Sequence, residues 1–351
     1  MPRPLPEIVR IDWPSGAPAP PVATDAALDR AAEVLRGGGL VAIPTETVYG
    51  LAADACDADA VEGIFRAKGR PATNPLIVHV ADVAMARSLA AAWPEAAERI
   101  AAAFWPGPVT VVVPKGPRIP AIVTAGGPTV ALRCPAHPLA RRLIERAGIP
   151  LAAPSANRSE RVSPTTAHHV LESLGDKVGL ILDAGPCERG IESTVVDCTT
   201  TPPRILRPGP LSRQQLEAAV AGPVEWSHER AAGDSGPEPA RSPGHGRRHY
   251  SPRTPLELAR DPAGRVAELL AAGRRVGWLV LEADDRARAL AGSRDLVAVP
   301  MPADPDAYAR QLYATLHALD QRQLDRIVVD PPPADEAWGA VRDRLSRAAE
   351  G

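Results

Sequence analysis

The chain has 351 residues, of which 45% are hydrophobic and 23% are charged, and its formal net charge is −2. This composition is typical of a globular protein and does not fit a surface that coats nucleic acid. No apolar run approaches the roughly 18 residues that a membrane-spanning helix needs, and the first residues lack the apolar core of a signal peptide. We therefore expect a cytoplasmic protein without membrane contact, and the length predicts two domains.

The positions of the cysteines and the scarcity of lysine bear on whether the chain binds a metal and on which basic residue has a special role. The four cysteines, Cys56, Cys134, Cys187 and Cys198, are widely spaced and form no CxxC pair. This spacing disfavours a zinc site and fits reduced thiols, so we expect no metal site built from side chains. Only three lysines occur among the 40 basic residues. In this arginine-rich background, Lys68 marks a position that favours a compact ammonium, or else it is an ordinary solvated lysine in a turn.

Hydrophobic periodicity predicts alternating helices and strands in the first two thirds of the chain. The first 23 residues are rich in proline and are expected to form an irregular arm. Helices are predicted over 24–36, 60–67, 82–92, 94–104, 137–147 and 212–220, and one more, capped by Ser163 or Thr165, runs towards Leu174. Strands are predicted over 40–43, 76–80, 129–133, 151–153, 180–183, 193–197 and 204–207, and one within 105–114.

The composition changes at residue 222. Residues 222–253 are dense in proline, glycine, serine, arginine and histidine and are expected to form a linker. Beyond it, helices within 256–272, 304–319 and 335–349 alternate with strands at 276–281 and 327–330, a pattern typical of a small parallel-sheet domain. The expected organisation is an arm at 1–23, a larger α/β domain at 24–221, the linker at 222–253 and a C-terminal α/β domain at 254–351.

The stretch from residue 37 to residue 79 carries the densest polar signal. The run TETVY at 45–49 follows the strand at 40–43, and Gly50 allows a tight turn. Lys68 and Arg70 lie in a turn before the next strand. Hydroxyls at one strand end and cations before the next suit the binding of a small polar molecule beside an anion.

Taken singly, each motif also has an ordinary structural explanation. The KGRP segment (68–71) is compatible with a solvated basic turn, and SAN after a proline is a common Asx-type turn. His79 beside a strand is compatible with a core histidine, and Ser193 with the first residue of a strand. The sequence contains no evident Ser-His-Asp set and no GxxxxGK[ST] phosphate loop.

The order of the motifs is more specific. PTETVYGL, KGRP, NPLIVH, WPGPVT, LRCPAHP, APSAN, GIESTVVD, RPG and HYSP follow one another between residues 44 and 252. This set resembles the YrdC-like family of threonylcarbamoyl-AMP synthases in its longer, two-domain form. The C-terminal segments VGWLVL and AVRDRL are similar to the second domain of that family. The resemblance implies a YrdC-like twisted α/β sheet with a deep concave basic site, followed by a smaller Rossmann-like parallel α/β domain.

The resemblance also implies an activity. Members of this family are nucleotidyltransferases that make L-threonylcarbamoyl-AMP from L-threonine, bicarbonate and ATP, with Mg2+ carried by the nucleotide, and release pyrophosphate. Partner transferase proteins then place the threonylcarbamoyl group on the adenosine 3′ of the anticodon in certain tRNAs, so direct tRNA binding is not required. Because the reaction joins two anions, we expect positioning and positive charge to matter more than a general base.

The resemblance assigns candidate residues to two subsites. Lys68 and Arg70 are the expected catalytic residues because they supply positive charge. The expected ATP-binding residues are Lys68, Arg70, Asn74, Thr129, Ser155, Asn157, Thr165, Arg207 and Tyr250. The expected L-threonine-binding residues are Thr47, Tyr49, His79, Arg133, Ser155 and Ser193. Tyr250 lies in the linker, so its HYSP segment (249–252) is expected to act as a lid. Serine lacks one methyl group, worth only ~1–3 kcal/mol in a pocket, so some use of serine is expected.

Three other interpretations stay open. One is carbamoyl adenylation from carbamoyl phosphate, as in hydrogenase-maturation proteins, although this chain lacks their zinc-finger cysteine pairs. Another is an RNA-binding module, which the net charge and the absence of basic stripes with aromatic residues disfavour. A purely structural role leaves the polar motifs unexplained. The distinguishing question is whether pyrophosphate release from ATP needs both threonine and bicarbonate.

Overall fold

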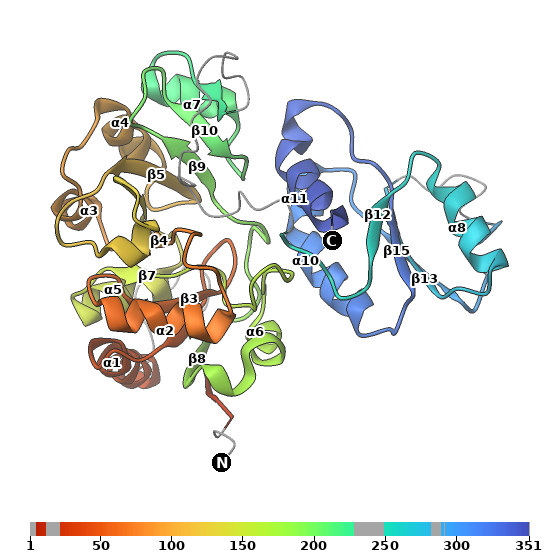
Figure 1. Cartoon of the computed structure of the whole chain (residues 1–351), viewed down its shortest axis with the longest axis horizontal. Coiled ribbons are helices and arrows are strands. Elements are labelled where there is room, and N and C mark those ends of the chain that lie inside the picture. Colours follow the sequence, from red (N-terminus) through yellow and green to blue (C-terminus); the bar gives the residue numbers. More distant parts are fainter. Residues whose placement is uncertain (1–4, 12–21, 228–248, 282–288, 291, 351) are drawn as a thin grey trace. The chain divides into compact units, whose positions relative to one another are not determined.

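The computed structural model of the chain describes residues 5–11, 22–227, 249–281, 289–290 and 292–350, which Figure 1 traces. Their contacts divide the chain into two compact units. The first unit holds the described residues up to 227, apart from two short segments, Glu160–Ser163 and Arg189–Ile191. The second unit holds those segments and the described residues from 249 onward. Of the expected linker, residues 228–248 lie outside the described part of the chain.

The first unit is built on one mixed β-sheet. Its strands are β1 (Glu7–Arg10), β2 (Val41–Ile43), β3 (Gly50–Asp54), β4 (Ile77–His79), β5 (Val109–Pro114), β6 (Thr129–Arg133), β7 (Leu151–Ala152), β8 (Leu180–Asp183), β9 (Thr194–Asp197), β10 (Arg204–Arg207) and β11 (Glu225–Trp226). Among the described residues they form an 11-stranded sheet in the order β1-β8-β2-β3-β7-β4-β6-β5-β9-β10-β11. Its helices are α1 (Val22–Arg36), α2 (Ala58–Lys68), α3 (Val83–Leu89), α4 (Glu95–Phe104), α5 (Pro138–Ala147), α6 (Ala167–Leu174) and α7 (Arg213–Val220), with short 3-10 helices η1 (Ala121–Thr124) and η2 (Gly175–Lys177).

Alternate residues of each strand pack on opposite faces of this sheet. On β2, Val41 and Ile43 pack with α1 and α5, whereas Ala42 packs in the cluster that includes α2 and α4. A smaller cluster contains strand residues alone, so no helix contributes to it. Its members are Ile77, Val112, Ala131 and Val195, with Leu206 partly buried beside them.

The structure differs from the sequence prediction at β1, at β3 and at the start of α6. β1 forms inside the segment expected to be irregular, because Ile8 and its neighbours pair in parallel with β8. β3 was not predicted, and its sequence, GLAAD, is short and poor in β-branched residues. The cap of α6 is Thr166, whose side chain accepts the backbone N–H of His169, and not Ser163 or Thr165.

The second unit contains a fully parallel sheet. Its strands are β12 (Leu256–Leu258), β13 (Val276–Val280), β14 (Leu296–Pro300) and β15 (Arg326–Val329), in the order β12-β15-β13-β14. Its helices are α8 (Pro262–Ala271), α10 (Pro305–Asp320) and α11 (Gly339–Ala349), with the 3-10 helix η4 (Glu336–Trp338). Every pairing of these strands is parallel, which confirms the predicted parallel α/β domain. The apolar strand β13, buried along its whole length, is typical of a strand covered on both faces.

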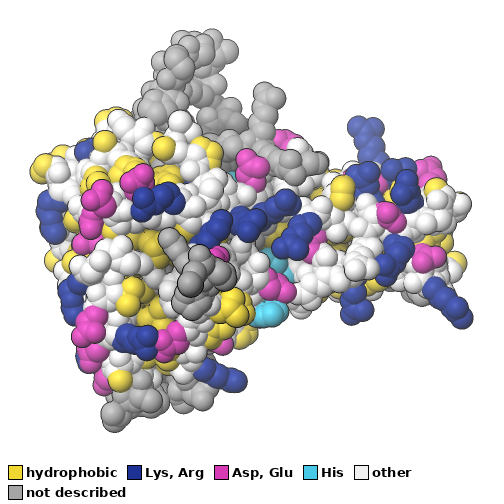
Figure 2. Space-filling view, turned by 60° about the horizontal axis from the view of Figure 1, so that its bottom comes forward, with side chains coloured by type: hydrophobic (Ala, Val, Ile, Leu, Met, Phe, Trp, Pro, Cys, Tyr) yellow, Lys and Arg dark blue, Asp and Glu magenta, His cyan; other side chains and the backbone are white. Residues whose placement is uncertain are grey.

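The surface carries both signs of charge. On the face of the molecule seen in Figure 2, both acidic and basic side chains are exposed, and several basic ones lie next to one another near the middle of the view. No helix in the described residues is long and apolar enough to cross a membrane.

Candidate active site

The PTETVYGL segment (44–51) forms the turn that connects the antiparallel strands β2 and β3. The hydroxyl of Thr45 accepts the backbone N–H groups of Thr47 and Val48, each at 3.2 Å, and donates to the carbonyl oxygen of Val48 at 2.6 Å. The hydroxyls of Thr45 and Thr47 lie 2.9 Å apart. The Thr45 side chain therefore stabilises the backbone of the turn over residues 45–48, as short hydroxyl side chains commonly do. Its buried neighbour Thr47 is left to accept a bond from another strand.

Polar side chains from four strands, β4, β6, β5 and β10, lie in one row across the sheet, with the apolar Val195 of β9 between the last two. His79 on β4 is in register with Arg133 on β6, and Val195 on β9 is in register with both Thr110 on β5 and Arg207 on β10. The antiparallel register of β5 and β6 places Thr110 opposite Arg133. Residues in register point to the same face of a sheet. We call His79, Arg133, Thr110 and Arg207 the polar row; the small strand-only cluster lies next to it on the same face.

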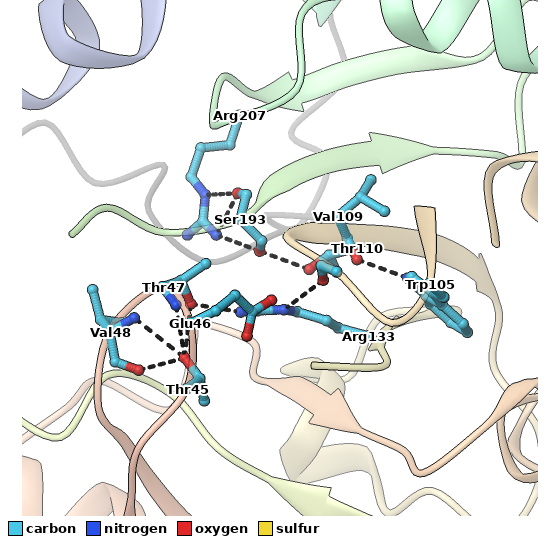
Figure 3. Close-up of polar contacts among 11 residues, drawn as sticks. Thr45, Glu46, Thr47, Val48, Trp105, Val109, Thr110, Arg133, Ser193 and Arg207 are labelled. Atoms are coloured by element: carbon cyan, nitrogen blue, oxygen red, sulfur yellow. Dashed lines mark hydrogen bonds and ion pairs between the residues drawn. The ribbon is translucent and has the colours of Figure 1, made fainter. Parts of the chain in front are cut away.

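Arg133 contacts three residues from other parts of the chain. Its Nη1 donates to the hydroxyl of Thr47 at 2.9 Å and its Nε donates to the carbonyl oxygen of Gly107 at 3.3 Å. Its Nη2 lies 2.6 Å from Oε1 of Glu46, and both side chains of this ion pair are 4% exposed (Figure 3). Burial alone would raise the pKa of Glu46, but the charge and hydrogen bond of Arg133, with backbone groups of Ala136 and Glu46, lower it. Glu46 is therefore a carboxylate at neutral pH.

Ser193 forms hydrogen bonds with two members of the polar row, Arg207 and Thr110. Arg207 donates to the carbonyl oxygen of Ser193 from Nε at 3.2 Å and from Nη2 at 2.9 Å, and Nη2 also lies 3.2 Å from the Ser193 hydroxyl. That hydroxyl is 2.8 Å from the hydroxyl of Thr110, as Figure 3 shows. Gly209 makes this approach of chain segments feasible, since a Cβ there would lie 2.3 Å from the backbone nitrogen of Thr194.

His79 is buried without a partner for either ring nitrogen among the described residues. Burial, and then the positive charge of Arg133, lower its pKa well below the ordinary value. The ring is therefore neutral near pH 7, with one nitrogen that donates and one that accepts. A buried imidazole in this state is suited to bind a small polar ligand.

A second polar cluster forms around Lys68. Asp57 caps the start of α2, and Gly69, with φ of 60°, ends the helix directly after Lys68. The Lys68 Nζ donates to the backbone carbonyl oxygens of Ser155 and Asn157, each at 2.5 Å. Desolvation, followed by the charge of Arg70, lowers the pKa of Lys68 well below its ordinary value. A phosphate group placed beside this amine would favour its charged form.

Arg70 and Asn74 extend this cluster. Arg70 donates from Nε to the carbonyl oxygen of Asn74 at 3.1 Å and from Nη2 to the carbonyl oxygen of Pro75 at 2.8 Å. The PTETVYGL turn connects the lysine cluster to the polar row, because the backbone carbonyl oxygen of Tyr49 accepts the N–H of Ala156 at 2.8 Å. The polar row and the lysine cluster, which both contain cationic side chains, are therefore both bonded to the PTETVYGL turn.

Other candidate residues lie outside these two groups. The Tyr49 hydroxyl donates to the carbonyl oxygen of Gly185 at 2.7 Å and is also 3.3 Å from Asp183, so it faces the protein interior. The Thr165 hydroxyl lies 3.3 Å from Nδ1 of His169. Thr129 begins β6, the strand that Arg133 ends.

Tyr250 belongs to the second unit. Its ring stacks on Tyr313 at a centroid distance of 5.8 Å and meets the guanidinium carbon of Arg344 at 5.1 Å. The His249 ring contacts it edge-on at 4.1 Å. These contacts bury the ring to 1% exposure, and its φ of 60° is unusual for a residue with a side chain. The lid function expected of HYSP stays a prediction.

The sequence analysis missed two residues of the site. Glu46 stands inside PTETVYGL, and Thr110 inside WPGPVT, but neither was assigned a role. A charged residue three positions after a buried strand was the available signal for Glu46. No comparable signal marks Thr110, whose role depends on the register of β5 and β6.

Comparison with known proteins assigns a family to this site. The profile of the Sua5/YciO/YrdC family, described as telomere recombination, matches residues 33–209, a range that includes the polar row and the lysine cluster. The chain belongs to this family. A second profile, described as the C-terminal domain of threonylcarbamoyl-AMP synthase, matches residues 211–350. This confirms the resemblance that the motifs indicated and the two-domain form.

Named relatives span nearly the whole chain. The threonylcarbamoyl-AMP synthase of Bacillus subtilis is 40% identical over 333 residues, which are 93% of this chain and 94% of the relative. The Pyrococcus abyssi synthase is 40% identical over 324 residues, 91% and 93% of the two chains. The crystal structure of P. abyssi Sua5 complexed with L-threonine matches with a TM-score of 0.85 at 37% identity, over 98% of this chain and 97% of that one. Escherichia coli YciO, at 21% identity, a TM-score of 0.51 and coverage of 60% and 97%, shares the fold alone. The predicted fold class is thus confirmed.

Proposed function

We propose that this member of the family synthesises L-threonylcarbamoyl-AMP from L-threonine, bicarbonate and ATP, with release of pyrophosphate. It acts as a nucleotidyltransferase, since the adenylyl group moves from ATP to a carbamate. The observation that carries the proposal is the polar row, in which two guanidinium groups, a neutral imidazole and a hydroxyl meet on one sheet face. The names of the relatives and the threonine bound to P. abyssi Sua5 support it.

The polar row suits L-threonine. Arg133 and His79 supply N–H groups for the carboxylate, and the hydroxyls of Thr47 and Ser193 suit the substrate hydroxyl. The strand-only apolar cluster beside the row offers an apolar wall for the methyl group. Tyr49 contributes the shape of its turn, and through Ala156 the position of Ser155, because its own hydroxyl is bonded to Gly185.

The lysine cluster suits the phosphates of ATP. Lys68 and Arg70 stabilise the charge that develops as the carbamate approaches the α-phosphorus, a step that needs preorganised cations more than a base. Arg207 adds positive charge from the other side of Ser193. Asn74, Thr129, Ser155, Asn157, Thr165 and Tyr250 are the remaining proposed ATP-side residues.

The proposal also concerns the metal and the partners. No group of three or more His, Cys, Asp or Glu side chains suited to a metal ion occurs in the described ranges, so we assign Mg2+ to the nucleotide phosphates. The product would pass to transferase proteins that modify the adenosine 3′ of the anticodon in tRNAs, a route that does not require direct tRNA binding by this chain. We infer a cytoplasmic location, in keeping with the four free cysteines.

One assay tests the proposal. Pyrophosphate release by the purified full-length chain is measured with ATP and Mg2+, with threonine and bicarbonate omitted in turn, and with carbamoyl phosphate in place of both. We expect release only when threonine and bicarbonate are present, together with a nucleotide product of the mass of threonylcarbamoyl-AMP. Release that depends on carbamoyl phosphate, or that ignores threonine, would overturn the proposal.

A further inference from the structure

The proposed threonine side accounts for every group of the substrate except its amino group. Under the proposed function, the polar row and its neighbours bind the carboxylate, the hydroxyl and the methyl group. The α-amino group is the one that becomes the carbamate nitrogen, and near neutral pH it is an ammonium. An ammonium has three hydrogen-bond donors and no acceptor, so oxygen atoms with negative charge bind it best.

Buried polar atoms without partners gather at three side chains of this part of the site. In the described residues of the first unit, six buried side-chain nitrogen or oxygen atoms lack a well-aligned hydrogen-bond partner. Five of them are both oxygens of Glu46, both ring nitrogens of His79 and Nη2 of Arg133, and the sixth is Nε of Arg141. An unsatisfied buried polar group costs free energy, so such groups are rare in folded proteins. Their concentration at one place indicates a site that a polar ligand completes.

Glu46 supplies the negatively charged acceptors among these atoms. Its side chain is 4% exposed, and its Oε1 lies 2.6 Å from Nη2 of Arg133. Burial acts to raise the pKa of Glu46, but the neighbouring guanidinium and backbone groups lower it, so the side chain is a carboxylate near pH 7. A buried ion pair is weak evidence for stability, since its replacement by apolar side chains is often neutral for folding. A role in binding explains this carboxylate better than stability does.

An α-amino acid is complementary to the Arg133–Glu46 pair. Its carboxylate accepts hydrogen bonds and is negative, as a ligand of Arg133 must be, and its ammonium donates hydrogen bonds and is positive, as a ligand of Glu46 must be. Both groups of the ligand are attached to one carbon, and the two side chains that match them are in contact with each other. A carboxylate bound by Arg133 therefore brings the ammonium next to Glu46. An acid without an amino group satisfies the guanidinium alone.

We propose that Glu46 binds the α-ammonium of the substrate, so that Arg133 and Glu46 together select a free α-amino acid over acids that lack the amino group. This inference rests on the proposed function, because it takes the polar row as the amino-acid side. Glu46 is then a specificity-determining residue, and it holds the nitrogen that becomes part of the carbamate.

The test compares two ligands that differ at the amino group alone. The α-hydroxy analogue of threonine keeps the carboxylate, the side-chain hydroxyl and the methyl group, but a hydroxyl replaces its ammonium. Binding of each ligand to the purified full-length chain is measured by titration calorimetry. We expect the wild type to bind threonine at least about tenfold more tightly, the usual effect of one hydrogen bond to a charged group. Equal affinities in the wild type would overturn the inference.

The isosteric substitution Glu46→Gln removes the charge and keeps the shape of the side chain. It should weaken threonine binding by at least about tenfold, for the same reason. Binding of the α-hydroxy analogue should stay unchanged or become tighter, because that ligand meets only Arg133. If both ligands weaken equally, Glu46 has a structural role alone and the inference is wrong. Unchanged threonine binding would contradict it as well.

Three further variants control for charge, for the carboxylate contact and for folding. Glu98→Gln removes the same charge from an exposed ion pair with Arg87, at 2.6 Å, and should change neither affinity. Arg133→Gln should weaken both ligands, because both carry the carboxylate. Glu46→Asp retains the charge and should keep the preference for threonine, so a folded Glu46→Asp without that preference would speak against the inference even if Glu46→Gln did not fold.

Thermal unfolding with and without each ligand shows which variants fold and repeats the comparison through ligand stabilisation. Threonine should stabilise the wild type more than its α-hydroxy analogue does, and this difference should shrink in Glu46→Gln. A wild type that binds threonine with a preference that Glu46→Gln retains refutes this inference alone. A wild type that binds neither ligand and releases no pyrophosphate with threonine refutes the proposed function instead.

Discussion

The side-chain nitrogen of Lys68 lies 2.5 Å from the backbone carbonyl oxygen of Asn157. This contact joins the KGRP and APSAN motifs, which the sequence separates by 89 positions. It also explains why a lysine stands here in an arginine-rich chain, since a compact ammonium can lie between two carbonyl oxygens where a planar guanidinium would not fit.

Loss of the Lys68 ammonium should impair adenylation. We expect Lys68→Ala to lower threonine-dependent pyrophosphate release by about 100-fold or more, the usual effect of removing one preorganised charge from a transition state. Lys68→Arg should not restore the rate, because of the geometry just described. Lys177→Ala, which changes a lysine outside both polar groups, serves as control. Undiminished release by Lys68→Ala would show that the assignment is wrong.

His79 should make stability depend on pH. Its folded pKa lies well below the ordinary 6.5, so below that pH the unfolded chain binds a proton that the folded chain resists. The free energy of unfolding should therefore fall on acidification from pH 6.5, by at most about 1.4 kcal/mol per pH unit from this group. His79→Gln should reduce the slope, measured by urea unfolding at several pH values. His137, whose pKa burial also lowers, leaves part of the slope in the variant.

Arg207 should affect both substrates, because it contacts Ser193 and adds charge to the ATP side. Arg207→Ala is expected to raise the KM for ATP and for threonine by about tenfold or more, as loss of charge-assisted hydrogen bonds does. Arg204→Ala is a matched control on the same strand, where Arg204 pairs with Glu225 at 3.1 Å in a partly exposed position. Steady-state kinetics give the KM values of both variants for ATP and for threonine. Equal effects would mean that Arg207 acts only through general charge.

Gly209 should tolerate no side chain. An added Cβ would lie 2.3 Å from the backbone nitrogen of Thr194, so Gly209→Ala must displace the chain next to Ser193. We expect the variant to lose about 1–3 kcal/mol of stability, as overpacked positions do, and to lose activity. Gly222→Ala, where nothing lies within 4 Å of the added atom, should behave like the wild type. Thermal unfolding and pyrophosphate release check both; a stable, active Gly209→Ala would contradict the tight packing.

Much of the fold could be inferred from short-range patterns. Gly69 and Gly148 end helices α2 and α5 in left-handed conformations, as glycines after periodic apolar segments do. The alternation of strands and helices after residue 254 was enough to predict the parallel sheet of the second unit. β1 was missed because its strand character comes from its pairing with β8, far along the chain. β3 was missed because its own residues, GLAAD, are poor in β-branched side chains.

The sequence by itself determined the residue types of the site, their order along the chain and the family to which they belong. Only the tertiary structure decided which of these residues meet. Strand register brings His79 and Arg133 side by side and sets Thr110 opposite Arg133, and register depends on pairings between distant segments. The same packing turned Tyr49 inward and paired Glu46 with Arg133, because a buried charge must find a partner in three dimensions.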